Sequence, residues 1–182
     1  FWFGSPEEAG YLAHREIWFR GGEAFDEEIR RRFLKLHEMA SAGDLDGWRD
    51  GPESCFALIL VLDQFSRNLF RGSGRAFAAD PLTRNHARHA IAQGFDKDVP
   101  PVHRNFFYLP FEHSEDINDQ HTSVALFGSM EPYRGAERSM DFAMRHLRVI
   151  IRFGRFPHRN QALGRTSTPS ETEFLAVNER GY

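Results

Sequence analysis

The sequence predicts an all-α protein built as an array of antiparallel helix pairs. Apolar residues recur at three- and four-residue spacing over most of the chain, and convincing series of alternating strands are missing. One nearly uninterrupted apolar run, from Cys55 to Phe65, is typical of a helix at the centre of a domain. With 182 residues, 41% of them hydrophobic, the chain predicts a single all-α domain over residues 1–182.

Three helices are expected in the first part of the chain. Residues 6–18 begin with a proline and two glutamates, which predicts a first helix. A second helix, Phe25–Ala40, is expected to take Asp26 as its N-cap and to end at Gly43. Pro52 suits the first position of the central helix. We expect four residues of that helix to be nearly fully buried: Cys55, Leu58, Ile59 and Leu62.

Two further helices are expected between residues 80 and 110, and a third follows them. Asp80 is typical of an N-cap and Gly94 of the residue that ends a helix. The next helix is expected to end at Pro110, because proline cannot continue the hydrogen-bond pattern of a helix. Ser114 is expected to cap the helix that runs toward Phe127.

The last two helices flank a loop. The long helix 135–153 is expected to end at Gly154. The sequence "TPSE" predicts a capping box, with Thr168 at the N-cap and Glu171 three residues later. The final helix is therefore expected to cover about Pro169–Val177.

Charge is unevenly distributed along the chain. The formal net charge is −3, yet no acid occurs from Phe142 to Ser170. Six arginines occupy this acid-free segment: Arg145, Arg148, Arg152, Arg155, Arg159 and Arg165. The acidic net charge and the few aromatic residues between these arginines argue against nucleic acid as a partner.

Composition also indicates where the protein resides. No apolar run is long enough to span a membrane and no signal-peptide pattern opens the chain, so we expect no membrane partner. The single cysteine, Cys55, fits a reducing compartment and is expected to pack in the core, which predicts a cytoplasmic location. The opening "FWFG" contains no Met, which predicts a start upstream of Phe1.

Polar residues at the end of the central helix form the first part of a candidate site, segment 63–71. Asp63 and Arg67 are four residues apart, on one helix face, where an ion pair can form. Because they follow eight apolar residues, we expect partial burial, which is costly for an unpaired charge. Either this pair is a structural bridge, or Arg67 or Arg71 reaches a ligand that Asp63 orients. Asn68 belongs to the same set.

Segment 112–115 is the second part of the candidate site. Glu112, His113 and Glu115 surround a helix start, where backbone N–H groups favour anions. His146 lies on the apolar stripe of its helix and is either a core residue or part of the site. His113, Glu115 and a second histidine could hold a metal. No Cys/His motif of fixed spacing supports that, so we expect no metal and no cofactor.

The third part is the loop 152–168. It carries five candidate ligand-binding residues: Arg155, His158, Arg159, Asn160 and Arg165. Guanidinium groups pair well with carboxylates and phosphates, which leaves two interpretations. In one, the arginines bridge the acids of the other two segments and hold the helices together. In the other, they leave positive charge facing a cleft. In both, we expect Arg155, His158 and Arg159 to lie close to Asp63 or to segment 112–115.

Six segments of the chain together resemble a known family: "FWFG", "LDQFSRNLFR", "AFAAD", "FFYLPFEHSE", "FGRFPHRN" and "LGRTSTPSE". In this order, over nearly the whole chain, they are similar to bacterial family 924 of the domains of unknown function. The resemblance implies a tetratricopeptide-like, right-handed bundle of helices and no established reaction. The family motif reads LDQFPRN, and Ser66 replaces its proline, which we expect to let the central helix run further. The candidate residues coincide with the family's motifs.

We expect a helical protein that binds a small anionic molecule or an acidic peptide. The polar cleft would be formed by the loop 152–168 and the segments 63–71 and 112–115. Two alternatives remain open: a hydrolase with His113 or His146 as general base, and a helical scaffold that binds a protein partner. The sequence leaves the ligand and the oligomeric state undetermined.

Overall fold

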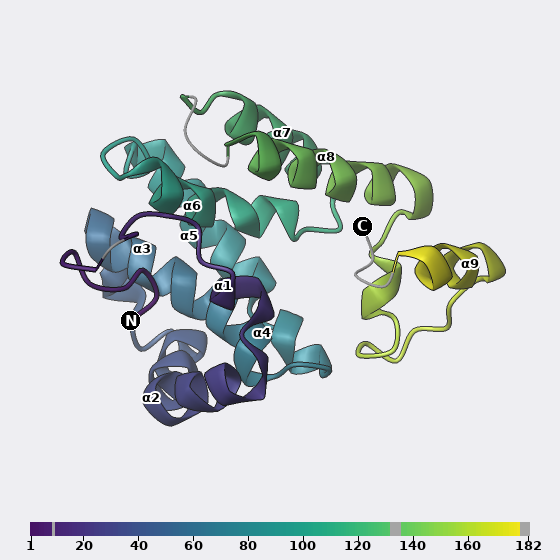
Figure 1. The fold of residues 1–182 in the computed structure, drawn as a ribbon, viewed down its shortest axis with the longest axis horizontal. Coiled ribbons are helices and arrows are strands. Elements are labelled where there is room, and N and C mark those ends of the chain that lie inside the picture. The colour runs from purple at the N-terminus through teal and green to yellow at the C-terminus, as the bar shows by residue number, and fades with distance from the viewer. Residues whose placement is uncertain (9, 132–135, 179–182) are drawn as a thin grey trace.

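The computed structural model of the chain describes residues 1–8, 10–131 and 136–178, and every regular element in this part is helical (Figure 1). The elements, in chain order, are α1 Ile17–Arg20, α2 Gly22–Ala42, η1 Asp46–Asp50, α3 Pro52–Leu60, η2 Val61–Phe65, α4 Ser66–Leu69, η3 Gly74–Phe77, α5 Asp80–Gln93, α6 Pro101–Glu112, α7 Ile117–Gly128, α8 Ala136–Phe153, η4 Pro157–Arg159 and α9 Pro169–Val177. The all-α class is therefore confirmed. The tetratricopeptide-like arrangement stays a prediction.

Neighbouring helices pack in an antiparallel manner on one side of the molecule. α7 contacts both α6 and α8, and the three helices run in alternating directions (Figure 1). α5 packs between α3 and α6, while α2 packs against α4 and η2. The loop after α8 and helix α9 lie together at one end of the molecule (Figure 1). This end has a small apolar cluster of its own, in which Phe153 contacts Phe174.

The central helix is the most deeply buried element, as its sequence predicts. Cys55, Leu58, Ile59 and Leu62 are at most 1% exposed. The helical winding continues from α3 through η2 into α4, so the chain remains helical beyond Ser66. η2 is a π-helical turn, a feature that the sequence pattern did not predict and that is frequent at functional sites.

The N-terminal segment differs from its prediction. A helix over residues 6–18 is wrong, because the described residues before α1 form turns. Gly10 has a φ of 94° and Leu12 a φ of 64°, and such positive values interrupt a right-handed helix. The segment is instead anchored by Trp2, whose ring stacks on Trp18 and whose carbonyl accepts a hydrogen bond from Trp18 Nε1 at 2.7 Å.

Four predicted helix boundaries are also wrong, those at Asp26, Asp80, Pro110 and Ser114. Asp26 is not an N-cap, because α2 begins at Gly22 and the Asp26 carboxylate binds Asn68 and Arg71 instead. Asp80 begins α5 itself, with Ala79 at the N-cap. Pro110 lies inside the last turn of α6.

The cap of α7 is Asp116, whose side chain accepts a hydrogen bond from the Asn118 N–H at 2.8 Å. The Ser114 hydroxyl, predicted as the cap, donates to Asp119 Oδ2.

The helix C-termini predicted at glycines are confirmed, and so is the capping box predicted at the start of the last helix. Gly43, Gly94 and Gly154 have φ values of 87°, 78° and 67°, which end α2, α5 and α8 in the left-handed conformation that glycine adopts without strain. The Thr168 side chain accepts a hydrogen bond from the Glu171 N–H, and the Glu171 carboxylate accepts one from the Thr168 N–H. Helix α9 begins and ends where it was predicted.

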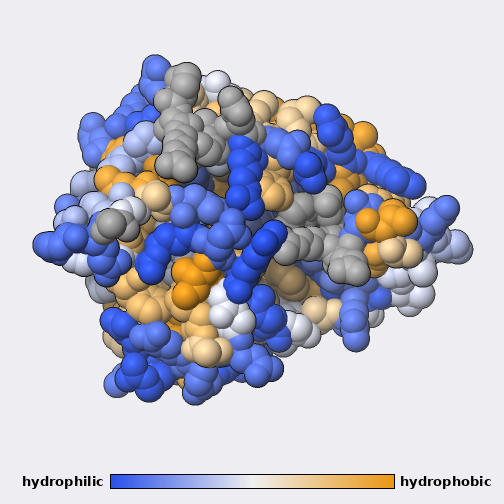
Figure 2. All heavy atoms as spheres, in the orientation of Figure 1, coloured by the Kyte–Doolittle hydropathy of each residue, from blue (hydrophilic) through white to orange (hydrophobic). Residues whose placement is uncertain are grey.

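The face of the molecule shown in Figure 2 is mostly hydrophilic, and hydrophobic residues form small separate patches on it. None of the helices in the described part of the chain has the length and apolar character needed to cross a membrane.

Leu58→Ala should lower the free energy of unfolding by about 2–5 kcal/mol, since Leu58 is 1% exposed in the central helix and its truncation leaves a cavity. Chemical denaturation measures the change. Ile151→Ala is a suitable control, because Ile151 is 65% exposed. Equal stability of the two variants would contradict the central placement of α3.

Candidate functional site

A buried hydrogen bond between Asp63 and His113 lies at the centre of the candidate site. Asp63 projects from η2, and its Oδ1 accepts a hydrogen bond from His113 Nδ1 at 2.9 Å. Arg67 Nη1 lies 3.1 Å from the same oxygen, and Gln64 Nε2 donates to Oδ2 at 2.6 Å. Burial alone would raise the pKa of Asp63, but Arg67 and His113 outweigh it and hold that pKa well below its ordinary value. Asp63 is therefore a permanent anion.

The contact with Asp63 fixes the proton of His113 on Nδ1, because an ionised carboxylate can only accept. Nε2 then carries the lone pair. The side chain remains 14% exposed, and Nε2 has no hydrogen-bond partner in the described part of the chain. Burial, and next the charge of Arg67, hold the pKa of His113 below its ordinary value, so the ring is neutral at neutral pH.

Asp80 joins two arginines to this pair. Its Oδ1 lies 3.2 Å from Arg67 Nη1, and its Oδ2 lies 3.3 Å from Arg159 Nη1. Arg159 Nη2 also donates to the His113 carbonyl at 2.8 Å. We call Asp63, Arg67, Asp80, His113 and Arg159 the central network. Asp80 was not among the predicted site residues, because an aspartate before proline at a helix start has the local pattern of a cap.

Arg159 is the least satisfied member of the central network. Its side chain is 7% exposed, and Nε has no hydrogen-bond partner among residues 1–8, 10–131 and 136–178. The guanidinium also lies over the rings of Phe77 and Phe156, at 4.4 and 4.7 Å from their centroids. Burial, and next the like charge of Arg67, lower the pKa of Arg159 to about 10.

Glu112 and His146 form a second buried pair beside the central network. His146 Nδ1 lies 3.3 Å from Glu112 Oε1 and 2.9 Å from the Phe142 carbonyl. Burial, and next the charge of Asp63, raise the pKa of Glu112 to about 8. Burial lowers the pKa of His146 to about 3. Both side chains are therefore neutral at neutral pH, which removes the cost of burying two charges.

A third set of contacts fixes the loop 152–168. Arg165 binds Glu115 through two hydrogen bonds of 2.8 and 2.9 Å, and Glu115 Oε1 accepts a third from the Phe156 N–H. Arg155 binds Glu171 in the same bidentate way, at 2.7 and 2.8 Å. Asn160 links the two pairs, since its Oδ1 accepts from Arg165 at 3.0 Å and its Nδ2 donates to Glu171 Oε2 at 3.4 Å.

The structure thus brings most of the predicted residues together, and the exceptions are Arg71 and Asn68. Arg159 reaches His113 as expected, and His158 lies near enough for Arg159 and Glu115 to influence its pKa, which burial lowers to about 4. Arg155 binds Glu171 of α9, and it also lies near enough to Glu115 for that carboxylate to contribute to its raised pKa.

Arg71 and Asn68 bind Asp26 of α2 and take no part in the central network. Within the described residues, no three His, Cys, Asp or Glu side chains gather as a metal site would require. Two surface pockets, of about 430 and 180 Å³, are lined by other residues.

Comparison with known proteins supports the resemblance found in the sequence. Residues 1–179 match the family described as "Bacterial protein of unknown function (DUF924)". A solved structure of a protein of unknown function from Agrobacterium tumefaciens is 43% identical, with a TM-score of 0.82 over 88% of each chain. No curated protein matches the chain.

The raised pKa of Glu112 makes stability depend on pH. Between the ordinary value of 4.5 and about 8, the folded chain holds a proton that the unfolded chain releases, so the free energy of unfolding falls as pH rises. Glu112→Gln removes this dependence. As the pH rises through this window, the Glu112→Gln variant should become more stable than the natural chain, by up to a few kcal/mol in the free energy of unfolding. The melting temperatures of the two proteins measure this difference. Identical pH profiles of the two proteins would contradict a buried, protonated Glu112.

Arg155→Ala should lower the melting temperature, because Glu171 is 3% exposed and would lose its bidentate partner. Arg148→Ala removes an equal charge from an exposed position of the same acid-free segment and is the control. Glu171→Gln combined with Arg155→Ala should be less destabilised than the sum of the single variants. A raised melting temperature in Arg155→Ala would instead favour crowded, unpaired positive charge in the loop.

Proposed function

This chain belongs to DUF924, a family of bacterial proteins of unknown function, and we propose that it binds a small anion at the central network, through Arg159, Arg67 and His113. One observation carries the proposal. Arg159 Nε is a buried donor for which the described residues offer no acceptor. Leaving a buried donor on a charged group unsatisfied is costly, so such groups in folded proteins usually have a ligand, an ion or an ordered water as partner.

Two like charges at the same place strengthen the need for an anion. Arg67 pairs with both Asp63 and Asp80, while Arg159 has Asp80 as its one carboxylate partner among the described residues and shares it with Arg67. The pKa of Arg159 is lowered to about 10 by burial and by Arg67. An oxyanion between the two guanidinium groups would relieve this repulsion.

His113 adds a group that responds to the anion. Its Nε2 is unprotonated and its side chain is partly exposed, so it can take up a proton from solvent. A bound anion beside Nε2, together with Asp63 at Nδ1, would stabilise the imidazolium form. Binding of the anion should therefore be coupled to proton uptake below neutral pH.

The burial of the network limits the class of ligand. Arg67 is 21% exposed and His113 14%, so only a small part of the network is open to solvent. Phosphate and small carboxylates present the oxygen geometry that guanidinium groups recognise, and both are compact. A terminal carboxylate of an acidic peptide has the same chemistry.

The Asp63–His113 contact favours a second candidate function. A carboxylate that fixes the tautomer of a histidine is the arrangement in which histidine serves as general base in hydrolases. The neutral Glu112 next in the chain could supply a proton. In that case the bound anionic group would be part of an ester substrate. Detection of the released alcohol would distinguish hydrolysis from binding alone.

A cytoplasmic location is part of the same proposal. The one cysteine, Cys55, is a free and buried thiol, and burial raises its pKa to about 11. An unreactive thiol of this kind packs as a small apolar group and requires no oxidising compartment.

Calorimetric titration of the full chain with inorganic phosphate and with acetate tests the anion site. We expect saturable binding in which protons are taken up, seen as a binding enthalpy that depends on the ionisation enthalpy of the buffer. His113→Asn keeps a donor toward Asp63 but lacks Nε2, and it should bind about tenfold more weakly, a loss of about 1.4 kcal/mol, without proton uptake.

His121→Asn is the matched control for this titration, because His121 is exposed on α7. It should bind both anions as the natural chain does. If neither anion binds up to the millimolar range, or if His113→Asn binds with unchanged affinity and proton uptake, the proposed function is wrong.

A further inference from the structure

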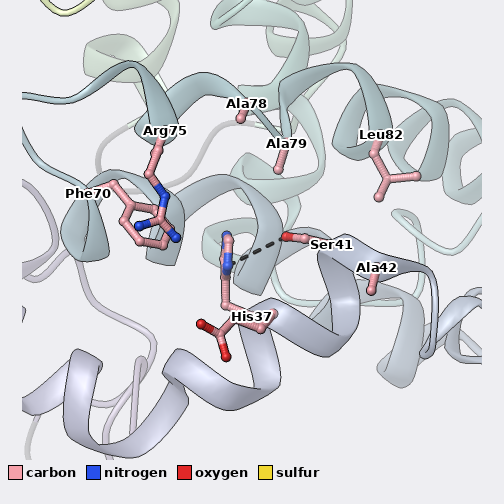
Figure 3. Close-up of a pocket in the computed structure, with 9 residues that line it drawn as sticks. His37, Ser41, Ala42, Phe70, Arg75, Ala78, Ala79 and Leu82 are labelled. Carbon is pink, nitrogen blue, oxygen red and sulfur yellow. Dashed lines mark hydrogen bonds between the residues drawn. The ribbon is translucent and has the colours of Figure 1, made fainter.

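A pocket of about 430 Å³ lies between α2 and the chain from Phe70 to Leu82, and no residue of the central network belongs to its lining. His37 and Ser41 rise from α2 on one side, and Arg75, Ala78, Ala79 and Leu82 lie on the other (Figure 3). Its volume falls within the range of small-molecule sites, which is about 300–1,000 Å³.

The histidine in the pocket wall has a defined tautomer. The Ser66 hydroxyl donates to the Leu62 carbonyl at 2.5 Å, so it can only accept from His37 Nε2, 2.7 Å away. His37 therefore carries its proton on Nε2 and offers the lone pair of Nδ1, toward which the Ser41 hydroxyl lies at 3.5 Å. Burial, and next the charge of Arg75, lower the pKa of His37, so the ring remains an acceptor at neutral pH.

Two opposite charges line this pocket without neutralising each other. Arg75 and Glu38 both belong to its lining, and no ion pair joins them. In the parts of the chain that the structure describes, neither side chain has another charged partner. The Arg75 guanidinium lies 4.0 Å from the centroid of the Phe70 ring, which holds it flat at one end of the pocket (Figure 3).

Arg75 differs in this respect from the arginines of the candidate site and its surroundings. Five of these bind a carboxylate: Arg67, Arg71, Arg155, Arg159 and Arg165. A guanidinium that is held in place by an aromatic ring and has no carboxylate is available to a carboxylate from outside the chain.

We propose that this pocket binds a free α-amino acid with an apolar side chain. Arg75 pairs with its carboxylate through the guanidinium fork, and Glu38 together with His37 Nδ1 accepts from its ammonium group. The apolar side chain lies toward the end lined by Ala42 and Leu82 (Figure 3). A single cation next to a glutamate disfavours phosphates and other multiply charged anions, so this ligand class is distinct from that of the central network.

Titration calorimetry of the full chain with L-leucine tests the proposal. Saturable binding is expected, and Arg75→Gln and Glu38→Gln should each weaken it at least about tenfold. Isocaproate lacks the amino group of leucine and isoamylamine lacks its carboxylate, so each should bind at least about tenfold more weakly than leucine. Arg31→Gln and Glu23→Gln are the controls. They remove exposed charges of α2 that lie outside the pocket lining, and they should leave the affinity unchanged.

A further variant closes the pocket without touching its charges. Ala78 is exposed at the pocket wall, so Ala78→Phe should fold normally, as its melting temperature will show, and should abolish leucine binding. Equal affinities for leucine and isocaproate would overturn the proposal. So would unchanged binding in Arg75→Gln, or no saturable binding up to the millimolar range.

Discussion

The position of one buried carboxylate, Asp63, constrains much of this structure. A charge with 1% exposure is costly unless it is paired and hydrogen-bonded, and Asp63 obtains its partners from two elements. Arg67 and Gln64 come from its own helical stretch, while His113 comes from the end of α6. Loss of Arg67, its cationic partner, would leave the charge without an ion pair, at a cost of about 3–5 kcal/mol. The end of α6 is therefore tied to the central helix by electrostatics as well as by packing.

The sequence predicts those parts of the fold that depend on local chemistry. Gly43 and Gly94 end helices because few other residues adopt a positive φ easily, and Thr168 caps α9 through atoms only three residues away. Predictions failed where distant residues compete for the same side chain. Asp26 has the local pattern of a cap, yet Arg71 binds its carboxylate from forty-five positions away. The local pattern around Asp26 does not decide such a competition, because the tertiary fold brings the second partner.

The same limit applies to the candidate site. The loop 152–168 contains arginines and no acidic residue, which predicts that these arginines pair with carboxylates elsewhere in the chain. Arg159 and Arg165 do so. Charge complementarity does not select the partner, since all carboxylates attract a guanidinium equally at long range. Arg155 therefore binds Glu171, and Asp80 enters the network unforeseen. The π-helical turn that places Asp63 leaves no trace in apolar periodicity.

Glu171 has two roles at once, because the carboxylate that completes the cap of α9 is the one that binds Arg155. The first turn of α9 and the loop after α8 therefore share one set of hydrogen bonds and should open as one cooperative unit. Their amide protons would exchange with solvent at similar free energies, below that of the central helix. Access to Arg159, which lies in the same loop, would then be governed by fluctuations of this unit and not by the motion of a single side chain.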